Sequence, residues 1–128
     1  MCRIVMWLLK FSGIALILTL CFALASPQED LDPIKVAPGT HKLVFENALL
    51  RVIQAQVPPG GHEPKHRHPH GVTVYLADYE VETKTFPDGQ ILRGKRRFGT
   101  VDWSEAVIHE VTNVGNTPSH AIRVELKY

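Results

Sequence analysis

The segment that decides the fold reads Gly60-Gly61-His62-Glu63-Pro64-Lys65-His66-Arg67-His68-Pro69-His70 and continues as Gly71-Val72-Thr73-Val74-Tyr75-Leu76. Its first half holds four histidines, and its second half is dense in β-branched and aromatic residues, which is typical of a strand. His66 and His68 are two positions apart, and residues at that spacing in a strand point to the same face. Two imidazoles on one face can bind the same metal ion through their ring nitrogens. The segment therefore predicts one half of a metal site.

On both sides of this segment the chain consists of short apolar or alternating runs separated by turn residues. After position 25, no window longer than ten residues shows a clean helical period. The runs that we expect to form strands are 34–36, 41–45, 49–57, 72–76, 79–86, 91–98, 107–113 and 121–126. Pro87-Asp88-Gly89 predicts a tight hairpin turn. Strands at this spacing predict an all-β fold with antiparallel sheets, and the pattern alone does not choose between a sandwich and a barrel.

A third metal ligand has to come from elsewhere in the fold, and His109 is the best candidate. It ends the apolar run Ala106-Val107-Ile108-His109, where an imidazole needs a reason to be present. His41 and His120 stand among polar or turn residues and look ordinary. Two plainer interpretations stay open: the histidine-rich segment has only adventitious metal affinity, and His109 is a hydrogen-bonded core histidine.

Two stretches resemble the sequence motifs of the cupin superfamily. Gly60, five further residues and then His66-Arg67-His68 are similar to the first half of the first cupin motif. The second motif, P-x-G-x-x-H-x-x-x-N, has a counterpart in Ser104-Glu105-Ala106-Val107-Ile108-His109-Glu110-Val111-Thr112-Asn113. The histidine and the asparagine keep their places, whereas serine replaces proline and alanine replaces glycine. The resemblance covers roughly residues 32–127.

This resemblance implies a cupin-type antiparallel β-barrel (a jelly roll or double-stranded β-helix) with a metal ion inside, held by His66, His68 and His109. Cupins commonly supply a glutamate three or four residues after the second histidine, where this chain has Val72 and Thr73. Three consequences stay open. A three-histidine site with open positions remains, as in thiol dioxygenases; another side chain substitutes; or the site has decayed. The candidates for substitution are Gln54, Gln56, Glu82 and His70.

The function that follows is an exported metal-binding cupin with small-molecule oxygenase chemistry. The cofactor is one divalent metal ion, which can be iron, nickel, copper, manganese or zinc. Imidazole ligands suit iron, copper, nickel and zinc alike, so the residues do not choose the metal. Tyr75 and Trp103 are the aromatic residues that we expect in the pocket. The competing hypothesis is a non-catalytic cupin that binds a small ligand or a partner, or acts as a structural dimer. The resemblance to small cupins implies that residues 34–45 pair two copies of the chain. The sequence leaves open whether the protein is an enzyme.

The first 25 residues have the pattern of a secretory signal peptide. Arg3 and Lys10 are their only charges, an apolar stretch follows, and Ala23-Leu24-Ala25 ends the segment. We expect a signal peptide over 1–25, a mobile leader over 26–33 and the barrel over 34–128. The predicted location is periplasmic or secreted, with no stable membrane span after cleavage. The alternative is an uncleaved N-terminal helix that anchors the protein in a membrane.

Cleavage changes the charge and the cysteine content. The mature chain has 12 basic and 13 acidic residues, a formal charge of −1, so nothing favours a nucleic-acid partner. Both cysteines, Cys2 and Cys21, leave with the signal peptide, and no disulfide is expected. The basic run 93–97 lies opposite Glu80 and Glu82 in the predicted hairpin, where cross-strand charge pairing explains it.

Overall fold

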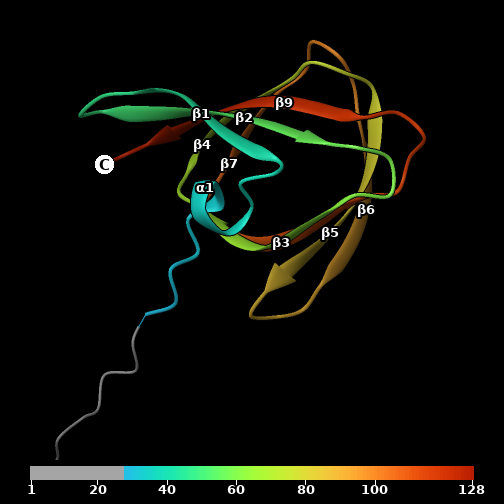
Figure 1. Ribbon diagram of the computed structural model, residues 1–128, viewed down its shortest axis with the longest axis horizontal. Coiled ribbons are helices and arrows are strands. Elements are labelled where there is room, and N and C mark those ends of the chain that lie inside the picture. Colours follow the sequence, from blue (N-terminus) through green and yellow to red (C-terminus); the bar gives the residue numbers. More distant parts are fainter. Residues whose placement is uncertain (1–27) are drawn as a thin grey trace, which may run out of the picture.

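Two antiparallel sheets face each other in the computed structural model, which describes residues 28–128 (Figure 1). One sheet contains, in spatial order, β1 (His41–Glu46), β2 (Leu50–Val57), β9 (Ser119–Leu126), β4 (Gly71–Tyr75) and β7 (Val101–Ser104). The other contains β3 (His62–His68), β8 (Val107–Asn113), β5 (Tyr79–Phe86) and β6 (Ile91–Arg96). The all-β prediction is confirmed, and the two sheets form a barrel.

The interior of the barrel is unusually polar for a protein core. Residues of β9 alternate strictly between buried and half-buried, and the buried set comprises Ser119, Ala121, Arg123 and Glu125. The apolar part of the core includes Ile53, Val57 and Val81. Buried polar side chains cost free energy unless they find partners, so an interior of this kind is typical of a binding site rather than of simple packing.

The chain changes sheets directly after the histidine-rich strand. β3 ends at His68 in the four-stranded sheet, and β4 begins at Gly71 in the five-stranded sheet. Gly71 lies so close to the backbone carbonyl of Val124 in β9 that a β-carbon at this position would clash with it. The same-face relation of alternate residues therefore stops at His68 and does not extend to His70.

The run 34–36, which the alternation predicts as a strand, is part of a short helix instead. Helix α1 spans Pro33–Val36, and the Asp32 side chain caps it by accepting a hydrogen bond from the Ile34 amide at 3.1 Å. An aspartate N-cap followed by proline at the first helical position is a strong helix start, and it overrides the alternation of a short run.

The segment before α1 also contacts the barrel. Leu31 and Pro33 are buried, and the Leu31 carbonyl accepts a hydrogen bond from the Arg67 amide of β3 at 2.8 Å. The domain boundaries stay a prediction, and the predicted signal peptide lies outside the described residues. Between positions 28 and 128 no helix is both long enough and apolar enough to cross a membrane.

The β5–β6 hairpin pairs its charges as expected. Glu82 lies opposite Arg93 and Glu80 opposite Lys95 in the strand register. Arg93 Nε lies 3.0 Å from Glu82 Oε2. The basic run 93–97 is thus partly explained by cross-strand pairing, and Glu82 is held on the hairpin rather than at the histidines.

Candidate metal centre

Four imidazoles meet on one side of the space between the sheets. His66 and His68 come from β3, and the antiparallel register of β3 and β8 places His109 directly opposite His66. The Nε2 atoms of His66 and His109 are 3.0 Å apart, and the ring centroid of His68 lies 4.8 Å from that of His66 and 5.3 Å from that of His109. The structure therefore brings the three predicted ligands together.

The fourth imidazole belongs to His41, the first residue of β1. Its side chain is buried, with a ring centroid 4.9 Å from His66 and 5.7 Å from His68. One ring nitrogen from each of His41, His66 and His68 lies within 4.8 Å of the others, so these three histidines could hold a metal ion. The expectation that His41 is ordinary was wrong. The rest of β1 is exposed, so no alternation marks its one buried position.

Hydrogen bonds orient the two histidines of β3. His66 Nδ1 lies 2.7 Å from the backbone carbonyl oxygen of Pro64, and His68 Nδ1 contacts the carboxylate of Glu125. A neutral imidazole that donates from Nδ1 carries its lone pair on Nε2, the atom that a metal ion would bind, and acceptors of this kind also raise ligand basicity. In His66 this Nε2 faces His109 Nε2 at 3.0 Å. Arg51 Nε donates to the other oxygen of Glu125 at 2.7 Å and fixes that carboxylate.

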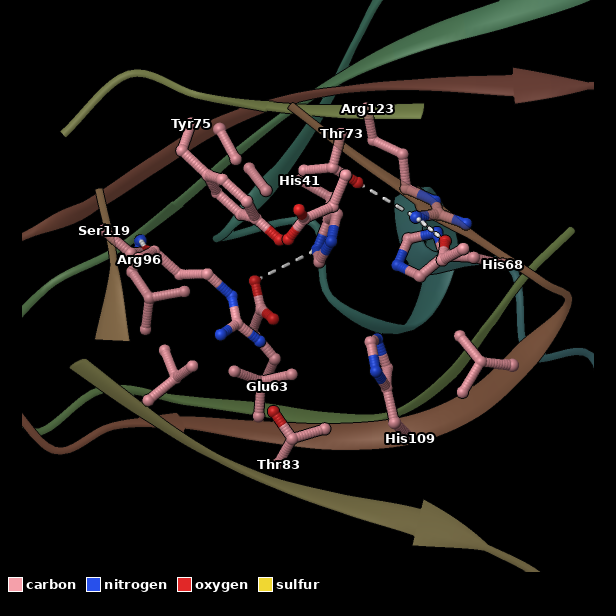
Figure 2. A pocket seen from close by; sticks show the side chains of 18 of the residues that line it. His41, Glu63, His68, Thr73, Tyr75, Thr83, Arg96, His109, Ser119 and Arg123 are labelled. Atoms are coloured by element: carbon pink, nitrogen blue, oxygen red, sulfur yellow. Dashed lines mark hydrogen bonds and ion pairs between the residues drawn. The ribbon is translucent and has the colours of Figure 1, made fainter. Parts of the chain in front are cut away.

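His41 has the same kind of arrangement around its ring. Its Nδ1 lies 3.1 Å from Thr40 Oγ1 and 3.6 Å from Glu63 Oε1. Glu63 is 5% exposed, and its Oε1 is one of two buried side-chain polar atoms in residues 28–128 without a hydrogen-bond partner. A carboxylate therefore faces Nδ1 of His41 (Figure 2), and Glu125 takes the corresponding place at Nδ1 of His68.

Burial keeps the four imidazoles in their neutral form. It lowers the pKa of His41 to about 4 and that of His109 to about 2, and neighbouring His66 adds to both shifts. The pKa values of His66 and His68 are also lowered, again chiefly by burial. Burial acts in the opposite direction on Glu63 and raises the pKa of its carboxyl group to about 7. Neutral imidazoles are the form that binds metal ions.

His41, His68 and His109 border a cavity of about 530 Å³, a size common for small-molecule sites. Its lining is mixed, with apolar residues such as Val81 and Val111 beside charged ones. Figure 2 shows Glu63 and Arg96 projecting into the cavity near His41, while Arg123 lies beyond His68. The Arg123 guanidinium is buried, and its Nε is the second unpartnered polar atom in the described part of the chain.

The place of the missing motif glutamate holds a threonine bound to an arginine. Thr73 lines the cavity, and its Oγ1 accepts a hydrogen bond from Arg123 Nη1 at 3.0 Å. Arg123 also donates to Ser104 Oγ at 2.7 Å and to the Pro69 carbonyl at 2.7 Å. A cation thus occupies the region where the family pattern predicts an anion.

The other predicted pocket residues divide into two groups. Tyr75 and Trp103 line the cavity. Gln54, Gln56 and His70 are not among the residues that line it. Gln54 Nε2 lies 2.8 Å from His120 Nε2, Gln56 is exposed, and the His70 ring lies 5.8 Å from both Trp103 and Tyr128.

Two motif-related expectations can be placed in the structure. Asn113 of the second motif is fully buried, and its Nδ2 donates to the carbonyls of Val57 and Thr117 at 2.9 and 2.8 Å. It therefore joins the β8–β9 turn to the end of β2. The carboxylate behind His68 is Glu125, which sequence reasoning missed. Its only signal was its parity with Ala121 in a strand that alternates.

Comparisons with known proteins agree with this architecture. No family model matches the sequence, and no curated protein matches it. Among solved structures, a cupin domain from Bordetella pertussis Tohama I is 26% identical, with a TM-score of 0.63 over 69% of this chain and 92% of that one. A double-stranded β-helix protein from Klebsiella pneumoniae is 21% identical, with a TM-score of 0.54 over 67% and 74% of the two chains.

A larger protein contains the same fold as one part of its length. The oxalate decarboxylase of Bacillus subtilis, which has Mn(II) centres, is 21% identical with a TM-score of 0.51. The match covers 73% of this chain and 27% of the decarboxylase chain, and at this identity it supports the fold alone.

Proposed function

This chain belongs to the cupin superfamily, and from that premise we propose that it binds one divalent metal ion through His66, His68 and His109 and acts on a small molecule. The observation that carries the proposal is the meeting of buried, neutral imidazoles at the edge of a cavity. Imidazole is a common ligand of iron, nickel, copper and zinc, and the donor set fits such an ion.

The surroundings of the histidines suit a metal ion better than they suit plain packing. Burial removes water from the imidazoles and lowers their pKa values, and repulsion between neighbouring rings opposes their protonation. The cluster is therefore neutral, which is the form that binds a metal ion. The acceptors at Nδ1 of His66 and His68 hold these rings in one tautomer. Such orientation is expected of ligands and has no evident use in an apolar core.

We further propose oxygenase chemistry for the loaded protein. A divalent iron bound by three imidazoles would supply the electrons and the open positions that dioxygen chemistry needs. The chain's own residues would bind and orient the substrate. Arg96 projects into the cavity and lies over the Tyr75 ring at 5.5 Å, where it can hold an anionic group, while the valine walls exclude water.

Metal content tests the centre directly. The purified protein is reconstituted separately with Fe(II), Mn(II) and Zn(II), desalted and analysed by mass spectrometry of the elements. We expect about one equivalent per chain, lost in His66→Ala and in His109→Ala. His62→Ala is the matched control, because His62 lies in the same strand but is exposed and bonded to Thr112. Binding that disappears only when His62 is replaced would contradict the proposed centre.

The oxygenase part needs a separate measurement. Nitric oxide binds to open positions of ferrous sites in place of dioxygen, and its adduct has a distinct electron paramagnetic resonance signal. We expect that signal from the Fe(II)-loaded protein and its absence from His66→Ala. A loaded protein without the signal would favour a non-catalytic cupin that binds a small ligand or a partner.

Export is part of the proposal. The basic start, the apolar stretch and Ala23-Leu24-Ala25 support cleavage before Ser26. The intact mass and the N-terminal residue of the protein recovered from the periplasm or medium would test it. A chain that stays with the membrane fraction and keeps its first residues would instead be anchored.

We also propose that two copies pair through residues 34–45. Strand β1 is the edge of the five-stranded sheet, and its Leu43, Val44 and Phe45 are exposed. Apolar side chains on an edge strand are a template for pairing with a second strand. Light scattering should give the mass of a dimer for the parent and of a monomer for Val44→Lys. A monomeric parent would reject the pairing.

A further inference from the structure

We propose that His41 is a fourth protein ligand of the metal centre and compensates for the absent motif glutamate. The inference rests on the metal centre proposed above and adds a ligand that no sequence motif marks. It makes the centre an all-imidazole set in which the two sheets of the barrel share the ion.

The position of the His41 ring is the first argument. His66, His68 and His109 all come from the four-stranded sheet, whereas His41 reaches the cluster from β1 of the opposite sheet. Its side chain is 2% exposed, and its ligand atom lies within 4.8 Å of one from each of His66 and His68. His41 would thus add an imidazole from the opposite sheet to an ion held by His66 and His68.

The side chains at the place of the motif glutamate and next to His68 are already engaged in other contacts. Thr73 stands in that region, and its hydroxyl is bonded to Arg123. Glu125 is the nearest carboxylate to His68, but its two oxygens face His68 Nδ1 and Arg51 Nε. Both carboxylate oxygens are therefore engaged behind the ring, and His41 is left as the neutral donor on that wall of the cavity.

The His41 ring also has acceptors beside its Nδ1 atom. Its Nδ1 lies near Thr40 Oγ1 and the unpartnered Oε1 of Glu63, so Nε2 remains for an ion. Ligating histidines usually have such an acceptor at the other ring nitrogen. A histidine that only fills space has no need of a buried carboxylate, which costs free energy to place there.

The ligand would also couple the metal to the N-terminal part of the barrel. The His41 amide donates to the Ala37 carbonyl at 2.9 Å, and Ala37 follows helix α1 directly. Metal binding should therefore restrain the segment 33–41 as well as β3 and β8. Four imidazoles leave fewer open positions than three, and they leave the full charge of a divalent ion uncompensated, which favours an anionic substrate.

The test compares the Co(II) affinity and spectrum of the parent with those of three variants. His41→Ala should raise the Kd about 30-fold or more, since even residues behind the ligands typically contribute 10–100-fold. His41→Glu should restore most of the affinity because a carboxylate can ligate. His120→Ala is the matched control, because His120 bonds to Gln54 outside the cluster and should leave the Kd unchanged.

Two readouts separate a ligand from a packing residue. The visible spectrum of bound Co(II) should change in His41→Ala and not in His120→Ala. In the parent, Co(II) should slow hydrogen exchange in residues 33–41, and in His41→Ala this protection should be lost while protection of β3 persists. A parent that binds no metal defeats the proposed centre itself. A parent that binds Co(II) while His41→Ala keeps its Kd and spectrum overturns only the role of His41.

Discussion

The two sheets of the barrel contribute to the histidine cluster in different ways. The four-stranded sheet supplies His66, His68 and His109, which the sequence motifs mark. The five-stranded sheet supplies His41 and Glu125, which no motif marks. The difference shows that the motifs mark the histidines of two neighbouring strands. The residues of the opposite sheet that complete the cluster lie far away in the sequence and outside the motifs.

The largest expected effect concerns Glu125 of the five-stranded sheet, which no motif marks. Glu125 is 1% exposed and accepts from Arg51 and His68, so Glu125→Gln removes the charge that both partners face. Breaking a buried ion pair on one side typically costs about 3–5 kcal/mol. We expect a loss of about 3 kcal/mol in the free energy of unfolding of the metal-free protein, measured in urea. The control is Glu82→Gln, whose exposed pair with Arg93 should contribute less than about 1 kcal/mol.

A Glu125→Gln variant with the same free energy of unfolding as the parent would contradict this expectation. It would mean that the contact of the half-buried Arg51 with Asp32 is sufficient, that His68 finds another partner, and that Glu125 has no special role behind the cluster. His41 would then be the one contribution to the cluster from the five-stranded sheet.

The next largest effect is the stabilisation of the folded chain by metal binding at the histidines that the motifs mark. Metal binding to the folded chain stabilises it by RT ln(1 + [L]/Kd), or about 2.7 kcal/mol at a hundredfold excess over Kd. We expect a shift of this size in urea unfolding with Mn(II), and none after chelation or in His66→Ala. An equal shift in parent and His66→Ala would mean that the ion binds elsewhere.

The sequence predicts one half of this site well and the other half poorly. His66 and His68 share a face because a strand has a period of two, and the pairing of β3 with β8 adds His109. His41 escapes this reasoning because it is a single inward residue at the start of an otherwise exposed strand. Alternation cannot mark a face that holds only one residue.

Local rules also explain the remaining differences in the fold. The run 34–36 alternates like a strand, but the Asp32 cap and Pro33 start a helix there. His70 has the parity of His66 and His68, yet the chain crosses to the other sheet after His68. Parity holds only within one strand, and the sequence does not state where a strand leaves its sheet.

A smaller effect concerns the pH dependence of the metal-free barrel. Glu63 has a folded-state pKa of about 7, raised by burial from 4.5. Between these values the folded chain binds more protons than the unfolded chain, so this residue lowers stability as the pH rises from about 4.5 to 7. His41, with its pKa lowered from 6.5 to about 4, acts in the opposite sense and loses stability as the pH falls through that range.

Glu63→Gln removes one of these opposing contributions. In chelator, its unfolding free energy should rise with pH more steeply than that of the parent, by up to about 1.4 kcal/mol per unit between pH 5 and 6.5. Urea titrations at pH 5, 6 and 7.5 measure the difference. Parallel curves for parent and variant would show that Glu63 is ionised in the folded barrel, and that His41 faces a carboxylate anion.

The smallest effect is expected at His70 and Gln54, which the sequence predicts as possible ligands and which the fold keeps away from the histidine cluster. His70 lies against Trp103 and Tyr128, and Gln54 bonds to His120, so neither contacts the cluster. Independent sites of this kind usually couple by less than about 0.5 kcal/mol, which is roughly a twofold change in an equilibrium constant. His70→Ala and Gln54→Ala should therefore leave the Kd for Mn(II) within about twofold of the parent. A larger loss in His70→Ala would mean that the segment after β3 rearranges when the metal binds. His70 would then contribute to the metal site together with His66 and His68.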